Sequence, residues 1–256
     1  MRKLGLLAAL ILGGCVTAPP VEPSPDHLHW RAAATNDTAP RPWAILLPGG
    51  GGLDIFGDGG AYYFSFAEML NRRGFDVLVV HYQEDARSVE EVGMPNYGAE
   101  IARTVYEGVS YERGLSRMDP RCDGVLFSWS MGGEGLLELA ARDPALLPGL
   151  RSAIAYYPSV QGRPDGFMPR IDLTILQGEE DQLTTLAALN RFLAAGEAYG
   201  AVTLHTLAGA KHGFDITTLK EPVLEASFAY DPANAALADA LLDATLTEGD
   251  YGCALD

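Results

Sequence analysis

Residues 124–142 read Gly-Val-Leu-Phe-Ser-Trp-Ser-Met-Gly-Gly-Glu-Gly-Leu-Leu-Glu-Leu-Ala-Ala-Arg, and this stretch decides the fold class. Its first four residues are an apolar run typical of a buried strand, whereas residues 131–142 are typical of a helix. A strand that enters a helix through a short turn is half of the unit that joins two parallel strands. The stretch therefore predicts an α/β domain.

The same alternation continues on both sides of this stretch. Strands are expected at residues 44–47, 75–81, 124–127, 152–157, 173–176 and 202–207, and helices at 62–73, 97–113, 131–142, 186–199 and 233–246. Strands that are apolar throughout are buried on both faces, which is typical of a parallel sheet joined by right-handed crossovers. We expect one α/β domain over residues 43–256, with a mostly parallel sheet of about six strands and helices on both faces.

The composition is that of an acidic globular protein. Of the 256 residues, 48% are hydrophobic, which excludes disorder as the main state of the chain. The chain has 18 Lys and Arg residues against 34 Asp and Glu residues, so its net charge at pH 7 is −16. A surface this acidic repels phosphate backbones, and we therefore expect no nucleic-acid partner.

The first residues are typical of an export signal. Met1-Arg2-Lys3 is basic, and residues 4–12 form an apolar run that is too short to cross a bilayer as a helix. The run ends in Leu-Gly-Gly-Cys, which resembles the bacterial lipobox. We expect residues 1–14 to be a lipoprotein signal peptide and Cys15 to be lipidated. The alternative is an ordinary secretory signal with an incidental cysteine.

The stretch after this cysteine has the composition of a linker. Residues 16–25 are rich in proline and lack apolar periodicity, so residues 15–42 are expected to be a lipidated, extended tether. The protein would then be exported and lipid-anchored in the cell envelope, with the anchor as its one contact with the membrane. Val16 stands where the lipobox resemblance would place Asp for retention at an inner membrane, which favours the outer membrane.

The turn after residues 124–127 carries the candidate nucleophile. Ser128, Ser130 and Gly132 form a small-x-Ser-x-Gly pattern. Small neighbours two residues away allow a sharp, strained turn, the nucleophile elbow, that lifts the central hydroxyl above the sheet. Ser128 stands where this pattern usually has Gly, and its side chain is nearly as small. The strand before and the helix after it distinguish Ser130 from a serine in an ordinary turn.

Two further residues complete the pattern of a nucleophilic site. A serine hydroxyl needs a base to accept its proton, and the base needs a group that orients it. The acid and then the histidine follow the nucleophile in chain order. Asp181 and His212 come after the last two expected strands, so both are expected at the sheet edge that carries Ser130. Glu179 and Glu180 are the alternatives to Asp181, which lies furthest past its strand.

A glycine run after the first expected strand is the candidate for stabilising an oxyanion. Residues 49–52 are all glycine, which lets the backbone approach a substrate and direct an N–H group toward it. One donor is expected to be the N–H group of Met131 and the other that of Gly50 or Gly51. The alternative is a phosphate-binding loop, which is disfavoured because no Lys-Ser/Thr pair follows the glycines.

Together these motifs resemble the dienelactone hydrolase family of α/β-hydrolases over residues 43–246. The resemblance is carried by Ser130-Met131-Gly132-Gly133, Tyr156-Tyr157-Pro158, Gly178-x-x-Asp181 and Gly209-Ala210-Lys211-His212-Gly213-Phe214. It implies the α/β-hydrolase fold without a large lid domain, cleavage of a small ester or lactone, and no metal or organic cofactor. The namesake enzymes have a cysteine where this chain has Ser130, so the substrate itself stays open.

Two other functions are compatible with these residues. An acyltransferase or a peptidase would use the same Ser130, Asp181 and His212. A non-catalytic binding lipoprotein of the envelope would keep the fold alone, although such proteins usually lose a triad residue and this chain has all three. The sequence does not indicate an oligomeric state.

The substrate pocket is expected to be lined by aromatic residues next to the motifs: Trp129, Tyr156, Tyr157 and Phe214. Each of them is equally suited to the hydrophobic core. Three basic residues near the same loops would meet a carboxylate on a substrate: Arg163, Arg170 and Lys211. A solvated surface position is more common for such residues.

Two of the three cysteines are placed to form a disulfide. Cys122 precedes the strand at residues 124–127, at the end of the sheet opposite the catalytic edge, and Cys253 follows a final helix that runs to the same end. In an oxidising compartment the two thiols could pair. Two free thiols are the alternative.

Overall fold

The computed structural model of the protein describes residues 25–34, 39–54, 57–162, 167–194, 201–220 and 227–254. The expected signal peptide at residues 1–14, the expected lipidation site Cys15 and most of the proline-rich stretch lie outside the described residues, as does Arg163. Within those ranges, no helix combines the length and the apolar character needed to cross a membrane.

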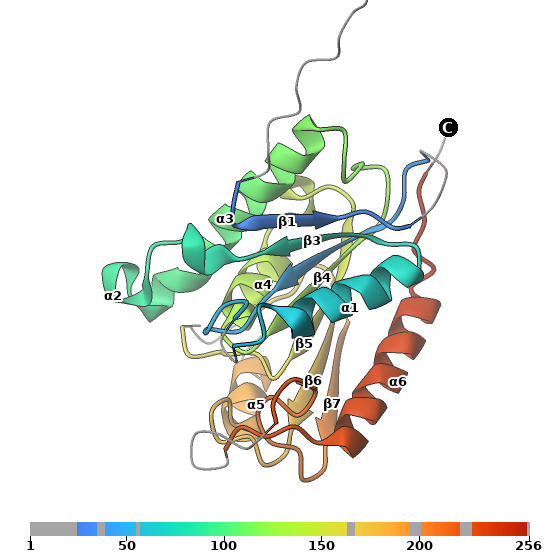
Figure 1. Ribbon diagram of the computed structural model, residues 1–256. Coiled ribbons are helices and arrows are strands. Elements are labelled where there is room, and N and C mark those ends of the chain that lie inside the picture. The colour runs from blue at the N-terminus through green and yellow to red at the C-terminus, as the bar shows by residue number, and fades with distance from the viewer. Residues whose placement is uncertain are drawn as a thin grey trace, which may run out of the picture.

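A seven-stranded sheet forms the centre of the molecule, in the order β1-β3-β2-β4-β5-β6-β7 (Figure 1). The strands are β1 (Leu28–Arg31), β2 (Trp43–Leu47), β3 (Asp76–Val80), β4 (Gly124–Trp129), β5 (Leu150–Tyr156), β6 (Asp172–Gly178) and β7 (Val202–Leu207). Strands β2 to β7 are parallel, and β1 is antiparallel to β3. The expected α/β class and mostly parallel sheet are confirmed.

Strand β1 corrects the expected start of the domain. It lies within residues 15–42, which the sequence indicated as a tether, and it adds a seventh strand at the edge of the sheet. Its residues Leu28–Arg31 pair with Val77–Val80 of β3. Of its four residues, Leu28 alone is fully buried. A strand this short, with a single buried residue, lacks a periodicity that sequence patterning can detect.

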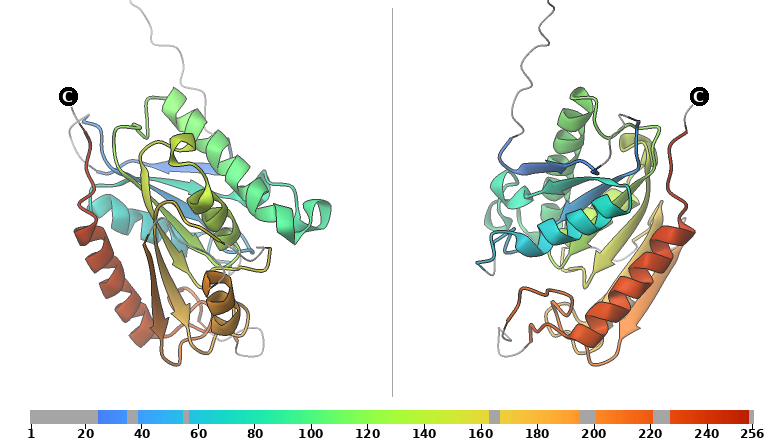
Figure 2. Two further views of the ribbon diagram at one scale, coloured as in Figure 1. Left: turned by 180° about the vertical axis from the view of Figure 1, so that it is seen from behind. Right: turned by 45° about the vertical axis from the view of Figure 1, so that its right-hand side comes forward.

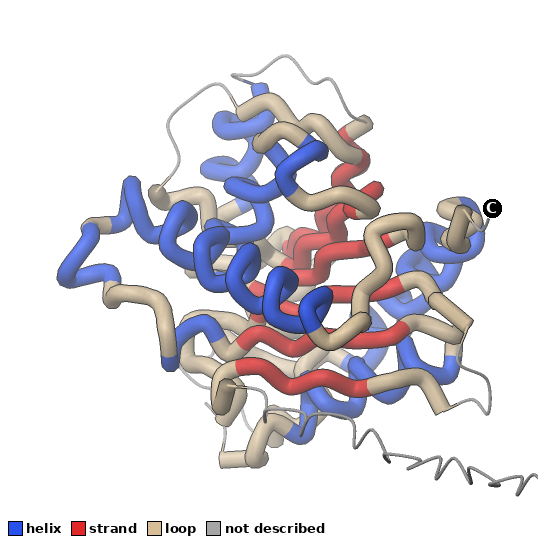
Figure 3. The backbone as a smooth tube through the Cα atoms, turned by 90° about the horizontal axis from the view of Figure 1, so that it is seen from above, coloured by secondary structure: helices blue, strands red, loops and turns tan. Residues whose placement is uncertain are grey.

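The helices cover both faces of the sheet (Figure 2). They are α1 (Ala61–Arg72), α2 (Val89–Val92), α3 (Met94–Gly114), α4 (Gly132–Ala141), α5 (Leu186–Ala194) and α6 (Pro232–Glu248), with short 3-10 helices η1 (Tyr82–Glu84) and η2 (Pro144–Leu146). Helices α3, α4 and α5 pack on one face and α1 and α6 on the other, each against its own hydrophobic cluster. Figure 3 shows the strands lying between these two sets of helices.

Strand β4 illustrates why this sheet needs helices on both sides. Leu126 belongs to the cluster under α3 and α4, whereas its neighbours Val125 and Phe127 belong to the cluster under α1 and α6. All three side chains are fully buried. Because successive residues of a strand point to opposite faces, a strand that is apolar throughout must be covered twice.

Helix α6 begins at a capping residue that its sequence supplies. The Asp231 side chain accepts hydrogen bonds from the N–H groups of Ala233 and Asn234, and Pro232 occupies the first turn, where its missing N–H is not needed. The helix then runs along the sheet and brings the following residues to the end opposite the loop that follows β7 (Figure 1).

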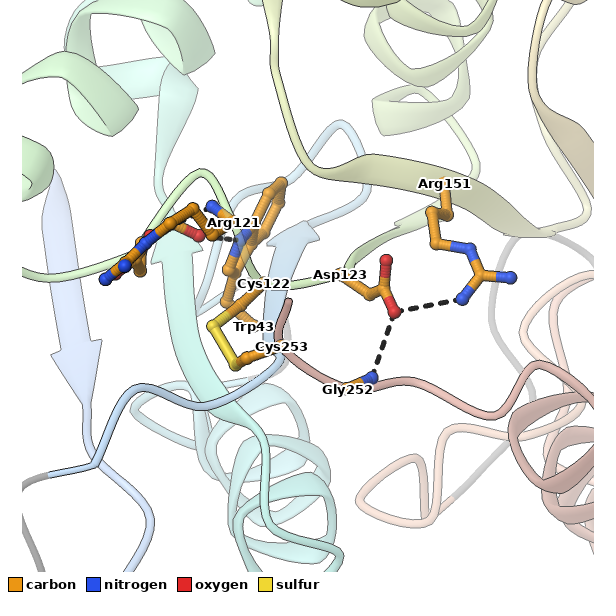
Figure 4. The surroundings of a disulfide bond; sticks show 8 residues. Trp43, Arg121, Cys122, Asp123, Arg151, Gly252 and Cys253 are labelled. Atoms are coloured by element: carbon orange, nitrogen blue, oxygen red, sulfur yellow. Dashed lines mark hydrogen bonds and ion pairs between the residues drawn. A yellow bond between two sulfur atoms is a disulfide. The ribbon is translucent and has the colours of Figure 1, made fainter. Parts of the chain in front are cut away.

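At that end, Cys122 and Cys253 form a disulfide (Figure 4). The two residues also form an antiparallel bridge. Backbone hydrogen bonds flank it, from the Asp123 N–H to the Gly252 carbonyl at 2.8 Å and from the Ala254 N–H to the Arg121 carbonyl at 2.9 Å. The Asp123 carboxylate accepts the Gly252 N–H and pairs with Arg151. The chain after α6 is therefore attached directly beneath the start of β4.

Candidate active site

Ser130 lies on the turn between β4 and α4. Its φ of 48° is in the left-handed region, which is unusual for a residue other than glycine and is found more often at functional sites. Backbone hydrogen bonds hold this conformation: the Ser130 N–H donates to the Tyr156 carbonyl at 3.0 Å, and its own carbonyl accepts from Gly133 at 2.9 Å and Ser159 at 2.8 Å. The hydroxyl is thereby presented above the carboxyl end of the sheet.

The residues two positions before and after Ser130, which are Ser128 and Gly132, are both small. A Cβ atom on Gly132 would lie 2.5 Å from the Leu47 and Pro48 carbonyl oxygens, so this position excludes any side chain. Ser128, where the elbow pattern usually has Gly, is completely buried in β4. Its small side chain fits the sheet without opening the turn.

The three residues of the predicted triad lie in one hydrogen-bonded chain. His212 Nε2 is 2.8 Å from Ser130 Oγ, and His212 Nδ1 is 2.8 Å from Asp181 Oδ2. His212 and Asp181 are 1% and 3% exposed, so water does not compete for these hydrogen bonds. Glu179 and Glu180, the alternatives to Asp181, are exposed at the surface. This arrangement can transfer the Ser130 proton to an imidazole that is oriented by a carboxylate.

The Asp181 carboxylate is held by donors from its own loop. Its Oδ1 accepts the N–H groups of Leu183 and Thr184 at 2.8 and 2.9 Å, and its Oδ2 lies 2.7 Å from Thr184 Oγ1. Burial by itself raises the pKa of Asp181, but the hydrogen bond and charge of His212 and the Thr184 donors together leave that pKa below its usual value. Asp181 is therefore stabilised as the carboxylate.

The His212 ring is fixed by aromatic neighbours as well as by Asp181. Its centroid lies 4.4 Å from that of Tyr157 and 5.0 Å from that of Phe228. The His212 carbonyl accepts the Ala229 N–H at 3.0 Å, which ties the loop after β7 to the segment before α6. Gly213, at φ 69°, permits this approach, because a Cβ atom there would lie 2.2 Å from the Phe228 ring.

The glycine loop after β2 lines the same cavity as Ser130 and His212. The Gly49 N–H donates to Tyr63 Oη at 2.9 Å, and the Gly49 carbonyl accepts from Gln83 Nε2 at 2.6 Å. A Cβ atom on Gly50 would be 3.2 Å from Met131 Cβ, so two of the expected oxyanion-hole residues are neighbours. The N–H of Met131 is at the start of α4, where a helix has N–H groups without intrahelical acceptors.

A cavity of about 190 Å³ opens onto Ser130 and His212. Besides these two it is lined by Gly49, Gly50, Gly51, Tyr63, Trp129, Tyr157, Leu183, Ile216 and Phe228. Of the expected aromatic residues, Trp129 and Tyr157 line it. Tyr156 and Phe214 are not among its lining residues. Both are packed in the cluster under α1 and α6, where Tyr156 stacks on Trp129 with ring centroids 5.2 Å apart. Arg170 and Lys211 are not among the lining residues.

Sequence reasoning missed several residues that shape this cavity. Tyr63 lies within the helix expected at residues 62–73, and nothing in its spacing indicated a hydrogen bond to the glycine loop. Leu183, Ile216 and Phe228 come from loops after the strands, and no motif marks them. Loop conformation is decided by contacts between distant segments, which single-sequence patterns do not contain.

Comparison with known proteins establishes the fold. No family model matches the sequence, and no curated protein is similar to it. Among solved structures, a dienelactone hydrolase-like promiscuous phosphotriesterase from metagenomic libraries is 19% identical, with a TM-score of 0.65 over 88% of this chain and 100% of that chain. A carboxylesterase of Lactobacillus plantarum is 16% identical, with a TM-score of 0.54 over 87% of this chain and 92% of that one.

A third structure is similar to the same degree. The propionate-bound esterase 2 of the planctomycete Thermogutta terrifontis is 17% identical, with a TM-score of 0.56 over 90% of this chain and 91% of that one. The chain therefore has the α/β-hydrolase fold seen in dienelactone hydrolase-like proteins and related esterases, as the resemblance of its motifs implied.

Proposed function

We propose that the protein is a serine hydrolase that cleaves small carboxylic esters or lactones through an acyl-enzyme. The observation that carries the proposal is the continuous hydrogen-bonded chain from Ser130 Oγ through His212 to Asp181, in a cavity that the glycine loop also lines. The similarity in fold to a phosphotriesterase and to carboxylesterases agrees with this chemistry.

The proposed reaction has two halves. Ser130 Oγ attacks the carbonyl carbon while His212 Nε2 takes its proton, and Asp181 holds the imidazole in the required tautomer. The oxyanion that forms accepts hydrogen bonds from the N–H groups of Met131 and of Gly50 or Gly51. The leaving alcohol takes the proton from His212. A water molecule then gives a proton to His212 and attacks the acyl carbon. The bond to Ser130 Oγ breaks as His212 returns the proton to Oγ, which releases the acid and restores the free hydroxyl.

The cavity favours small, uncharged acyl groups. Its volume is about 190 Å³, and most of its lining side chains are apolar or aromatic. No Arg or Lys is found among the described residues that line it, and the net charge of −16 repels anions at a distance. A substrate with a free carboxylate would therefore lose its hydration without gaining a cationic partner.

Covalent labelling tests this proposal directly. The purified protein is treated with a fluorophosphonate probe, and the adduct is mapped by mass spectrometry. We expect labelling at Ser130 that is absent in Ser130→Ala and strongly slowed in His212→Ala. A folded wild-type chain that stays unlabelled and hydrolyses no ester would overturn the proposal in favour of a binding protein.

The acyl-group preference and the acceptor need separate measurements. A series of p-nitrophenyl esters of increasing chain length should show kcat/KM highest for the short acyl groups. Product analysis with an added alcohol or amine then distinguishes hydrolysis from acyl transfer. A hydrolase releases mainly the free acid, whereas an acyltransferase gives mainly the new ester or amide.

We further propose that the protein is exported and lipid-anchored through Cys15. The Leu-Gly-Gly-Cys stretch supports this, and so does the Cys122–Cys253 disulfide, because such bonds persist mainly in oxidising compartments. Mass spectrometry of the mature N-terminal peptide should find a lipid-modified Cys15. Cys15→Ser should abolish the modification and move the protein out of the membrane fraction; an unmodified N-terminus at Cys15 would contradict the proposal.

A further inference from the structure

Asp215 is a buried carboxylate that the proposed reaction does not use. It is 8% exposed and accepts three side-chain hydrogen bonds, from Trp129 Nε1 at 2.8 Å, from Tyr157 Oη at 2.6 Å and from Tyr62 Oη. No salt bridge to it is found in the described part of the chain. Burial raises the pKa of Asp215, and the three aromatic donors oppose this rise by stabilising the carboxylate.

Two of the three donors belong to the walls of the catalytic cavity. Trp129 directly precedes Ser130, and Tyr157 follows β5 in a left-handed conformation with φ 39°. Both residues line the cavity, and both are 0% exposed to solvent. Their polar side-chain atoms donate hydrogen bonds to Asp215, which fixes the orientation of each ring.

Tyr157 also contacts His212 and is linked to Asp181 through Thr184. Its ring centroid lies 4.4 Å from that of His212, and its carbonyl oxygen is 3.1 Å from Thr184 Oγ1, the hydroxyl that is 2.7 Å from Asp181 Oδ2. A rotation of the Tyr157 ring would therefore disturb the packing of the imidazole. The hydrogen bond to Asp215 prevents this rotation.

The third donor connects Asp215 with the glycine loop. Tyr62 is on α1 beside Tyr63, which accepts the Gly49 N–H, and the two rings pack edge to face with centroids 5.1 Å apart. Asp215 itself lies three residues after His212 on the loop that follows β7. One carboxylate thus joins the elbow, the end of β5, α1 and the histidine loop.

We propose that Asp215 is a positioning residue that acts through Trp129 and Tyr157 to align His212 with Ser130. The inference rests on the proposed serine hydrolase function. A buried carboxylate without a cationic partner contributes less to stability than apolar residues of similar volume would, so stability alone does not account for it. A carboxylate is suited to orienting several donors at once, because it offers two oxygens with about four lone-pair sites.

The same arrangement favours the charge that forms during the reaction. When His212 accepts the Ser130 proton, a cation develops beside the Tyr157 ring. The Tyr157 hydroxyl donates to a carboxylate, which makes its ring a better partner for that cation. Misplacing the imidazole would slow proton transfer in the transition state and leave ground-state binding almost unchanged.

Three variants test the inference. Asp215→Asn keeps the shape of the side chain and removes its charge, and Tyr157→Phe keeps the ring and removes one donor. Asp239→Asn is the matched control, because Asp239 of α6 lines the same cleft beside Asp215 and is not hydrogen-bonded to Tyr62, Trp129 or Tyr157 in the described structure. Kinetics with a short-chain ester are measured well below the melting temperature of each variant.

The expected result is a change in kcat with little change in KM. Asp215→Asn should lower kcat at least ~10-fold while KM changes less than ~3-fold, since a misplaced catalytic group costs rate and not binding. Tyr157→Phe should lower kcat by a smaller factor. The double variant should be no slower than the slower single variant, because both act through one contact. Asp239→Asn should match the wild type.

Several results would overturn the inference. A folded Asp215→Asn with the kcat of the wild type, even with a lower melting temperature, would show that the carboxylate is purely structural. Losses that multiply in the double variant would show that Asp215 does not act through Tyr157. If Asp215→Asn fails to fold, Tyr157→Phe and Trp129→Phe test the proposal instead, because each removes one donor to Asp215. A wild-type kcat in both variants would contradict it. A wild type that is itself unlabelled and inactive contradicts the proposed function instead.

Discussion

The two ends of strand β4 are built in opposite ways. At its carboxyl end the chain turns sharply into Ser130, and charged side chains are buried and held by hydrogen bonds. At its amino end Cys122 is joined covalently to Cys253, and the nearby Asp123–Arg151 pair is partly exposed to solvent. The carboxyl end therefore has the arrangement expected of a reactive site, whereas the amino end fixes the segment after α6 to the sheet.

The strained backbone and the buried charged side chains of this comparison lie at the carboxyl end of the sheet. Asp181, His212 and Asp215 are each nearly inaccessible to solvent, and each is hydrogen-bonded to a residue from a distant segment of the chain. Such a site holds its geometry only if the strands beneath it do not move. The disulfide and the backbone bonds beside it close the opposite end of the sheet, where no reactive geometry has to be preserved.

The largest expected effect comes from a substitution at the carboxyl end of β4 that changes activity and leaves stability almost unchanged. Ser130→Ala should lower kcat/KM by a factor on the order of 10⁵–10⁶, because the nucleophile acts as a unit with its base. The free energy of unfolding should change little, since the hydroxyl makes its single side-chain contact with His212. Ester hydrolysis and urea unfolding measure the two quantities. Ser65→Ala, at an exposed position of α1, is the control and should leave both unchanged.

The second prediction concerns the amino end of β4, where removal of the disulfide should change stability and leave activity almost unchanged. Replacing both Cys122 and Cys253 by Ala removes a bond that closes a separation of 131 residues, and loop-closure entropy puts the loss of unfolding free energy at up to ~4–5 kcal/mol. Urea unfolding with and without reductant measures this loss. The kcat of the folded variant should stay within about twofold of wild type, because the sheet separates the two ends. A large loss of kcat without a loss of stability would contradict the separation of roles.

A third change tests how firmly the glycine loop is held. Tyr63→Phe removes the hydroxyl that accepts the Gly49 N–H and leaves that donor unpaired. A buried donor without an acceptor destabilises the observed loop conformation by about 1–3 kcal/mol. We expect the loop to move away from the oxyanion position and kcat to fall about 10-fold. The reactivity of Ser130 toward the fluorophosphonate probe should fall in parallel. Unchanged kcat would show that Gln83 holds the loop by itself.

The smallest expected effect is on the pH dependence of stability. The folded-state pKa of Asp181 lies below its usual value, so Asp181 stabilises the native protein above its unfolded-state pKa of about 3.9. This contribution is lost as the pH falls through the lower, folded-state value. Asp181→Asn should therefore flatten the fall in stability below about pH 4, as measured by urea unfolding. The disulfide variant should keep the wild-type slope there, because neither cysteine titrates in that range.

Local sequence patterns were enough to predict the parallel sheet and the edge that carries the candidate active site. The apolar strands and the helices between them indicated the parallel sheet, since continuous apolar runs are buried on both faces. The motif around Ser130 and the loops with Asp181 and His212 could be placed at one edge because parallel strands end on the same side. Their hydrogen-bonded contact is present in the structure, and their catalytic roles stay predictions until activity is measured.

Other features could not be predicted because their cause is distant in the chain. Strand β1 exists because its four residues complete the open edge of β3, which no pattern within residues 28–31 reveals. Tyr156 and Tyr157 both belong to the hydrophobic cluster under α1 and α6, yet only Tyr157 of the two lines the cavity at Ser130. The network around Asp215 joins residues separated by up to 153 positions.

The amino-acid sequence by itself determined the α/β class, the order of strands β2 to β7 along the chain and the residue types capable of nucleophilic chemistry, because these depend on local periodicity and local turns. The tertiary structure alone decided which aromatic residues line the cavity, which hydroxyl supports the glycine loop and which donors the buried Asp215 carboxylate accepts from. Those outcomes depend on long-range packing, in which each side chain is positioned by neighbours that the local sequence does not contain.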